Sequence, residues 1–166
     1  INSPDGDQGF PGNAQIKVTY TVSSDGIKLA YDGICDQDTV FNMTNHSYFN
    51  LAGHNKPELA MAQTLQLSCN RFTVADEESI PTGEMRDVSG SPMDFRCEKP
   101  VGQDINEKYE PLILQQGYDH NFEINTQPCA KLHSNETGIT MVTYEQGDDG
   151  YATLFTNPPA PELPSL

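Results

Sequence analysis

The stretch TNHSYFNLAGH, residues 44–54, holds two histidines, two asparagines, a tyrosine and a phenylalanine within eleven positions. An imidazole can donate or accept a proton near neutral pH, so this mixture of side chains could support acid–base chemistry. The alternative is a half-buried β-strand whose solvent face is merely polar, and for an isolated pattern that alternative is favoured. A metal pair is not indicated, because His46 and His54 lie eight residues apart, which is not a recognised ligand spacing.

Residues 39–51 alternate in a way that predicts a β-strand. His46 and Tyr48 share one polar face of this strand, whereas Phe41 and Phe49 lie on the opposite, apolar face. A polar face that carries an imidazole and a phenol, backed by an apolar face, suits the floor of a ligand groove.

Charged side chains occur in three other stretches. In GYDHNF, residues 117–122, Asp119 lies two residues after a glycine and just before a predicted strand, a place where a loop can present a side chain rigidly. Residues 72–96 crowd carboxylates and arginines into turn-like sequence, where solvated charge is a better explanation than a catalytic carboxylate pair. A calcium loop beginning at Asp5 is not predicted, because the EF-hand pattern needs glycine at its sixth position, where Phe10 stands.

Many short strands separated by turns indicate an all-β chain. The alternating segments 14–23 and 26–34 flank an Asp–Gly turn signal and predict a hairpin. Segments 62–74, 120–125 and 138–144 alternate as well, and no helical stripe of useful length is present. This spacing favours a single domain with the fold of an antiparallel β-sandwich.

The chain is strongly acidic: nine Lys and Arg against 24 Asp and Glu give a net charge of −15. Phosphate backbones and anionic membrane surfaces attract basic proteins, so a nucleic-acid or membrane partner is disfavoured. The four cysteines form no C-x-x-C pair, which predicts free thiols in a reducing cytosol. No apolar run approaches membrane-spanning length and no signal-peptide pattern begins the chain, so we expect a cytoplasmic protein.

Four stretches, in this order, resemble the galactose mutarotase (aldose 1-epimerase) family: SPDGDQGFPGN, TNHSYFNLAGH, IPTGEMRDVSGSPMDF and GYDHNF. Each is weak alone, but together they span about residues 2–145. The resemblance implies the large antiparallel β-sandwich of that family, a galactose mutarotase-like supersandwich. It also implies that the partner is a free aldose such as galactose or glucose, whose α and β anomers are interconverted through ring opening. The family uses neither a metal nor an organic cofactor.

Carried over motif by motif, the resemblance gives His46 the role of proton donor to the ring oxygen of the sugar. An imidazole suits this role because it gains and loses a proton easily near neutral pH. Asp119 matches the carboxylate that hydrogen-bonds sugar hydroxyls. Ser47 and Tyr48 follow His46 in the motif and are expected to line the pocket.

Other features of the family have no counterpart in this sequence. The resemblance implies a longer chain, with a sugar-binding arginine and a second histidine ahead of Ile1 and a general-base glutamate beyond the C-terminus. Residues 1–145 are therefore expected to be the central part of a mutarotase-like sandwich, incomplete at both ends, and residues 146–166 a divergent proline-rich tail. We expect such a chain to be catalytically impaired. A non-catalytic carbohydrate-binding module on the same fold is the alternative, and the oligomeric state is left open.

Overall fold

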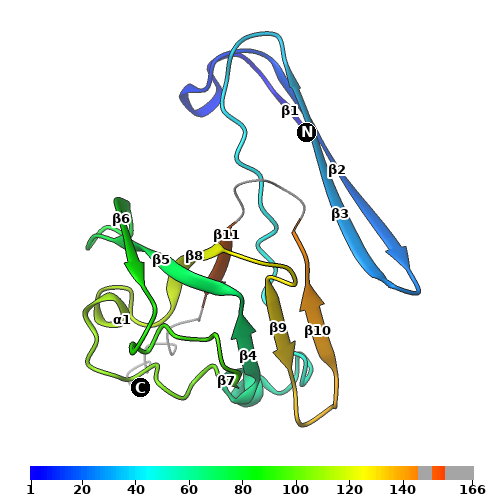
Figure 1. Ribbon diagram of the computed structural model, residues 1–166. Helices are drawn as coiled ribbons and strands as arrows, with labels where there is room; N and C mark the ends of the chain where they lie inside the picture. The colour runs from blue at the N-terminus through cyan, green and yellow to red at the C-terminus, as the bar shows by residue number, and fades with distance from the viewer. Residues whose placement is uncertain (146–150, 156–166) are drawn as a thin grey trace, which may run out of the picture. The chain divides into compact units, whose positions relative to one another are not determined.

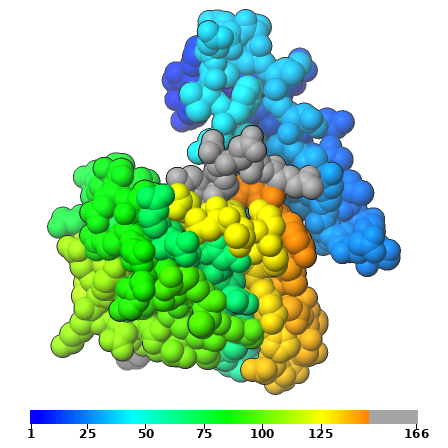
Figure 2. Space-filling model, viewed as in Figure 1, coloured from blue at the N-terminus to red at the C-terminus, as the bar shows by residue number. Residues whose placement is uncertain are grey.

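The computed structural model describes residues 1–145 and 151–155. Contacts divide the chain into two compact units, Ile1–Ser47 and the part from Tyr48 onward. Figure 1 shows the strands of both units, and each unit is described by itself. In the space-filling view, residues 70–125 of the second unit form one continuous surface, green to yellow (Figure 2).

The first unit is an antiparallel sheet of three strands in the order β1-β2-β3. Its strands are β1 (Asn2–Ser3), β2 (Ala14–Ser23) and β3 (Gly26–Cys35), and a short 3-10 turn, η1, spans Asp7–Gly9. The predicted hairpin is confirmed. Strands β2 and β3 pair from Ala14 opposite Cys35 to Ser23 opposite Gly26, which leaves a two-residue loop. Because Val22 pairs with Ile27, apolar side chains of both strands fall on one face.

Tight turns occupy the glycine- and proline-rich segment that precedes β2. The main-chain N–H of Gly12 donates to Oδ1 of Asp5 at 2.7 Å. A Cβ added at Gly12, whose φ is +87°, would collide with Sγ of Cys35, so this close approach requires glycine. The side chain of Asn13 in turn donates to the carboxylate of Asp36 at 2.8 Å. In the described structure Asp5 therefore braces a turn.

The second unit contains two four-stranded antiparallel sheets, in the orders β10-β9-β4-β7 and β11-β8-β5-β6. The first sheet is formed by β4 (Thr64–Leu67), β7 (Lys99–Pro100), β9 (Ala130–His133) and β10 (Thr140–Thr143). The second is formed by β5 (Cys69–Ala75), β6 (Pro81–Asp87), β8 (Asp119–Ile124) and β11 (Tyr151–Phe155). The short helical elements are η2 (Pro57–Ala62) and α1 (Glu110–Leu114).

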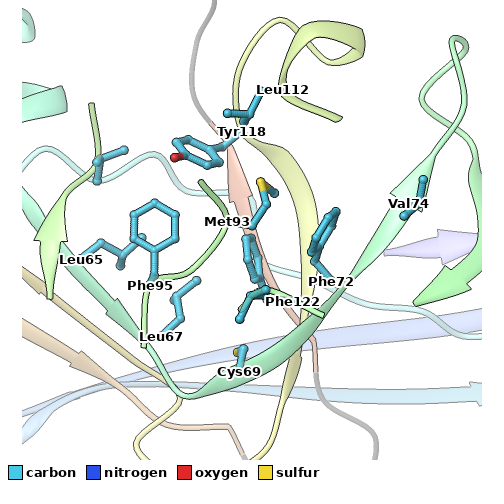
Figure 3. Packing of buried hydrophobic residues seen from close by; sticks show 12 residues of the cluster. Leu65, Leu67, Cys69, Phe72, Val74, Met93, Phe95, Leu112, Tyr118 and Phe122 are labelled. Atoms are coloured by element: carbon cyan, nitrogen blue, oxygen red, sulfur yellow. The ribbon is translucent and has the colours of Figure 1, made fainter. Parts of the chain in front are cut away.

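Side chains from both of these sheets enter one hydrophobic core (Figure 3). Leu65 and Leu67 reach it from β4, and Phe72 and Phe122 reach it from β5 and β8. Met93 joins them from the loop after β6 and is fully buried, as are both phenylalanines. The antiparallel β-sandwich predicted from the alternation is confirmed.

The predicted strand over 62–74 is wrong in one respect: it is two strands, β4 and β5, that belong to different sheets. The change of sheet occurs at Ser68, whose N–H donates to the carbonyl of Cys129 and whose carbonyl accepts from the N–H of Asn125. A register shift between Cys69 and Phe72 then changes which residues point inward. Both hydrogen-bond partners are more than fifty residues away, so local alternation could not indicate this break.

The predicted strand over 39–51 is wrong as well, because these residues form loop and turn. A strand needs a paired neighbour, and in the described part of the chain no strand pairs with this segment. The side chain of Asn45 bonds instead to the N–H of Ser47, two residues on, which competes with a β-ladder. Helix α1 was not predicted, since Glu110–Leu114 is too short to produce a periodic stripe.

Composition and apolar content led to predictions about the cysteines, about membrane-spanning segments and about the proline-rich residues at the C-terminal end. All four cysteines are free thiols, as predicted. No described helix has both the length and the apolar composition needed to cross a membrane. The prolines of residues 157–166 lie outside the described residues.

Candidate functional site

Asp119 is an exposed carboxylate held between two buried aromatic residues. It is the first residue of β8, and its neighbours Tyr118 and His120 are 0% and 2% exposed. Successive side chains of a strand point to opposite faces, so Phe122 follows His120 into the core. The carboxylate of Asp119 is thereby directed to the other face of the sheet, with both of its flanking residues anchored.

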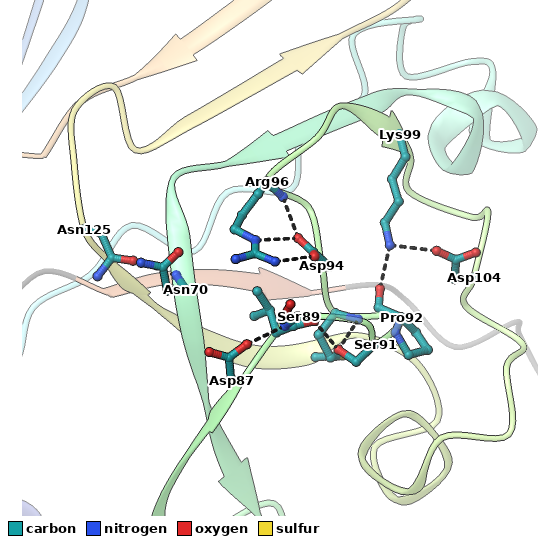
Figure 4. Close-up of polar contacts among 12 residues, drawn as sticks. Asn70, Asp87, Ser89, Ser91, Pro92, Asp94, Arg96, Lys99, Asp104 and Asn125 are labelled. Carbon is teal, nitrogen blue, oxygen red and sulfur yellow. Dashed lines mark hydrogen bonds and ion pairs between the residues drawn. The ribbon is translucent and has the colours of Figure 1, made fainter.

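Tyr118 is held by a polar contact at its far end. Its hydroxyl donates to the main-chain carbonyl oxygen of Pro92 at 3.0 Å, and its ring packs edge-on against Phe95 at 5.1 Å between centroids. The ammonium group of Lys99 donates to the same carbonyl at 2.8 Å and to Asp104 at 2.7 Å (Figure 4). Burial raises the pKa of Tyr118, so its hydroxyl stays protonated and remains a donor.

His120 makes a different contact, to the main chain of Asp119. Its Nδ1 accepts from the N–H of Asp119 at 3.1 Å, which places the ring proton of the neutral form on Nε2. Nε2 is buried and has no hydrogen-bond partner within the described residues. A buried donor of this kind costs about 1–3 kcal/mol. Burial lowers the pKa of His120 from 6.5 to about 4, and the ring packs edge-on against Phe72 at 5.5 Å.

The face of β8 that carries Asp119 also carries Asn121 and Glu123. Glu123 accepts two hydrogen bonds from the guanidinium of Arg71 on β5, at 2.8 and 2.5 Å. These bonds lower the pKa of Glu123. Because the pair is partly exposed, it contributes little to stability, but it occupies the carboxylate and leaves Asp119 as the acidic group at the start of the strand.

His46 is presented by a turn in the first unit. Oδ1 of Asn45 accepts from the N–H of Ser47 at 3.1 Å, so the local hydrogen bond spans His46. The amide nitrogen of Asn45 also donates to the hydroxyl of Tyr20 on β2 at 3.4 Å. His46 and Ser47 are both exposed. A side chain at the centre of such a turn projects outward. His46 therefore does not lie on the face of a strand, and the groove floor predicted from that strand is not formed.

The segment that leads to this turn packs on the apolar face of the hairpin. A Cβ added at Gly33 would lie 3.0 Å from the ring of Phe41, so the ring covers the main chain of β3 at this point. Gly33 pairs with Ile16, whose side chain lines a cavity of about 240 Å³ together with Phe41 and Met43. The contacts of Phe41 and Asn45 with the hairpin therefore fix the approach to His46.

The second half of the histidine motif, which begins at Tyr48, belongs to the second unit and is braced by amide side chains. Asn50 donates to the carbonyls of Gly53 and Lys56 at 3.0 and 2.9 Å. The buried Gln63 accepts from the N–H of Leu51 at 2.7 Å. Tyr48 itself is 60% exposed. The chain two and three residues after Tyr48 is thus fixed, while the ring of Tyr48 remains accessible.

The four residues predicted for the site fall in both units. His46 and Ser47 end the first, and Tyr48 and Asp119 belong to the second. Sequence reasoning did not assign supporting roles to Tyr118 and His120. The available signal was their position on either side of Asp119, since aromatic residues that flank a polar one in a strand share the buried face.

A surface hollow of about 550 Å³ lies elsewhere in the second unit and contains none of these four residues. Four of its charged side chains form two pairs: Arg96 donates to both carboxylate oxygens of Asp94, and Lys99 donates to Asp104 (Figure 4). These partners lower the pKa of both carboxyl groups. Nor do the described residues contain any group of three or more His, Cys, Asp and Glu side chains suited to a metal ion.

Residues 1–154 match the protein-family model described as aldose 1-epimerase. The chain belongs to the aldose 1-epimerase family. It is 40% identical over 145 residues to the aldose 1-epimerase of Haemophilus influenzae, and the aligned region covers 85% of this chain and 42% of that protein. It is 35% identical over 146 residues to the galactose mutarotase of Sus scrofa, and the aligned region covers 86% of this chain and 41% of that protein.

Solved structures of related epimerases agree with the fold. The galactose 1-epimerase of Lactobacillus acidophilus superimposes with a TM-score of 0.73 at 31% identity, over 81% of this chain and 40% of that one. An aldose epimerase homologue from C. elegans gives a TM-score of 0.71 at 27% identity, over 86% of this chain and 43% of the homologue. The supersandwich fold expected of the family is thus confirmed. The chain spans about two fifths of the length of the relatives it matches.

Proposed function

We propose that this member of the aldose 1-epimerase family binds a free aldose, such as galactose or glucose, and promotes the interconversion of its anomers. The observation that carries the proposal is the placement of Asp119, an exposed carboxylate fixed between the buried side chains of Tyr118 and His120. A rigid carboxylate suits recognition of sugar hydroxyls, because each hydroxyl can donate a charge-assisted hydrogen bond to it. The names of the curated relatives do not favour a non-catalytic binding module.

In this proposal His46 supplies a proton to the ring oxygen of the sugar while a base takes the proton of the anomeric hydroxyl. The C1–O5 bond then breaks, the aldehyde end rotates, and ring closure on either face returns both protons. His46 is exposed at the centre of a turn, where its imidazole can exchange protons with solvent between turnovers. Ser47 and Tyr48, both exposed next to His46 in the sequence, are proposed to line the pocket.

We assign the general base to none of the described glutamates. The resemblance matches none of them to the family's general base, and Glu123 and Glu136 are already paired with Arg71 and Lys56. The 166-residue chain by itself is therefore proposed to supply the acid and the sugar contacts, and to turn over more slowly than a protein with both groups. A missing general base costs about 10²–10⁴-fold in rate.

The acidic composition agrees with a small neutral ligand. A net charge of −15 disfavours polyanionic partners such as nucleic acids and anionic membranes, but it does not oppose a neutral sugar. We propose a cytoplasmic enzyme that needs no metal or organic cofactor.

Binding of galactose to the Asp119→Asn variant tests the proposal. The substitution keeps the shape of the side chain but removes its charge, so affinity should fall by about 10- to 100-fold, the worth of a hydrogen bond to a charged group. Titration followed by ligand-detected NMR measures it. The matched control is Glu77→Gln, which removes one charge from an exposed residue of the same unit and should leave affinity unchanged. Equal affinity in all three proteins would contradict the role of Asp119.

A further inference from the structure

His120 is a buried polar side chain that none of the proposed steps uses. It is 2% exposed, and its Nε2 has no hydrogen-bond partner within the described residues. The hydrogen bond it does make in the described structure is with the main-chain N–H of Asp119, which donates to Nδ1 at 3.1 Å. The ring of His120 thus makes its hydrogen bond to the residue that is proposed to bind the sugar.

Packing alone does not explain an imidazole at this position. The neighbouring ring of Phe72 lies 5.5 Å away at an interplanar angle of 85°, an arrangement that another aromatic ring could equally adopt. A phenylalanine would fill a similar volume without burying an unpaired N–H, which is unfavourable in an apolar core. The polar atom with a clear structural use is Nδ1.

The chain needs an anchor at this point because it enters β8 from a turn. Gln116 and Gly117 have φ values of +55° and +137°, and the N–H of Gly117 donates to the carbonyl of Leu112 at 2.9 Å. Two residues later, Asp119 begins the strand. The bond to His120 fixes the peptide plane that leads into Asp119, and with it the direction of the bond from Cα to Cβ.

We propose that His120 is a positioning residue of the aldose site: by accepting the N–H of Asp119, its ring holds the Asp119 carboxylate in the orientation that binds sugar hydroxyls. This inference rests on the proposed function, because it concerns the affinity that Asp119 provides. It assigns to His120 no contact with the sugar and no transfer of a proton.

Two substitutions separate the acceptor from the ring. His120→Phe keeps an aromatic ring and removes the acceptor, and His120→Asn keeps an acceptor at the same distance from Cβ and removes the ring. Loss of one neutral hydrogen bond predicts that His120→Phe binds galactose about 5-fold more weakly, whereas His120→Asn stays within about 2-fold of the unsubstituted chain. The amide of residue 119 should also exchange its hydrogen faster in His120→Phe.

A double-mutant cycle distinguishes positioning from general structural support. If His120 acts through Asp119, His120→Phe should lower affinity no further when Asp119→Asn is already present. If His120→Phe lowers the affinity for galactose by the same factor with and without Asp119→Asn, the inference is overturned. Unchanged affinity in His120→Phe would also overturn it. Should that variant fail to fold, His120→Gln, whose acceptor lies one bond farther out, replaces it and must bind more weakly than His120→Asn.

The two levels of the proposal fail in different ways. If the unsubstituted chain does not bind galactose, the proposed function is wrong and the role of His120 in sugar binding falls with it. If the unsubstituted chain and His120→Phe bind equally well and Asp119→Asn does not, the proposed function stands and the positioning role is wrong.

Discussion

Tyr118 and Lys99 share one acceptor, the main-chain carbonyl oxygen of Pro92, with donor distances of 3.0 and 2.8 Å. The shared contact ties the residue that precedes Asp119 to the loop that follows β6, and the ring of Phe95 lies against both donors. The entry to β8 is thus fixed from the core side, which leaves the carboxylate of Asp119 as the exposed part of a rigid element.

Tyr118→Phe should destabilise the protein without changing its fold. The substitution removes a buried hydrogen bond and leaves Lys99 as the donor to the Pro92 carbonyl, so we expect a loss of about 1–2 kcal/mol in the free energy of unfolding. Urea denaturation measures this loss. Tyr144→Phe is the control, because Tyr144 is 67% exposed and its hydroxyl can bond to water in either state. Equal stability of both variants would show that the Pro92 contact is not formed.

The lowered pKa of His120 predicts a specific loss of stability in mild acid. The folded protein holds the ring neutral down to about pH 4, whereas the unfolded chain binds a proton below about pH 6.5. The unfolded state therefore binds more protons between these values. The contribution of His120 to the free energy of unfolding is thus at its highest above pH 6.5 and decreases as the pH falls to 4. Its full size is at most about 3 kcal/mol.

Comparison with His120→Phe isolates that contribution. Carboxylates with lowered pKa values, such as Asp94, Asp104 and Glu123, also destabilise the fold in acid, but they do so in both proteins. The difference in unfolding free energy between the two proteins should therefore shift in favour of the phenylalanine variant between pH 7 and pH 4. A difference that is independent of pH would mean that the folded state does not disfavour the charged ring.

Gly33→Ala tests the contact that guides the chain to His46. The new methyl group would lie 3.0 Å from the ring of Phe41, which must then move. Overpacking of this kind costs about 1–3 kcal/mol. Thermal unfolding should show the loss in Gly33→Ala, and Phe41→Ala should remove most of it in the double variant. An equal loss in both backgrounds would place the strain of Gly33→Ala somewhere other than against Phe41.

The elements that sequence reasoning found are those specified by nearby residues. The hairpin of β2 and β3 was predictable because alternation on both sides of a short turn determines its pairing. Strand β8 was predictable in the same way. The alternation in residues 39–51 was equally regular but misleading, because Asn45 satisfies the N–H of Ser47 locally and no described strand pairs with the segment.

What could not be predicted depends on residues far apart in the chain. Ser68 ends β4 because its partners lie in residues 125–129. In the same way, Asp119 could be proposed from its motif, but the anchoring of Tyr118 by Pro92, 26 residues away, could not. Local patterns therefore indicated which residues to propose for the site, and the folded chain shows what holds Asp119 in place.

Magnetisation-exchange NMR between the α and β anomers of galactose tests the central claim most directly. The account predicts exchange faster than in buffer for the 166-residue chain, a return to the buffer rate in His46→Ala, and retained exchange in His54→Ala, which removes the other exposed histidine of the motif. Exchange at the buffer rate from the folded, unsubstituted chain, or undiminished exchange in His46→Ala, would contradict it.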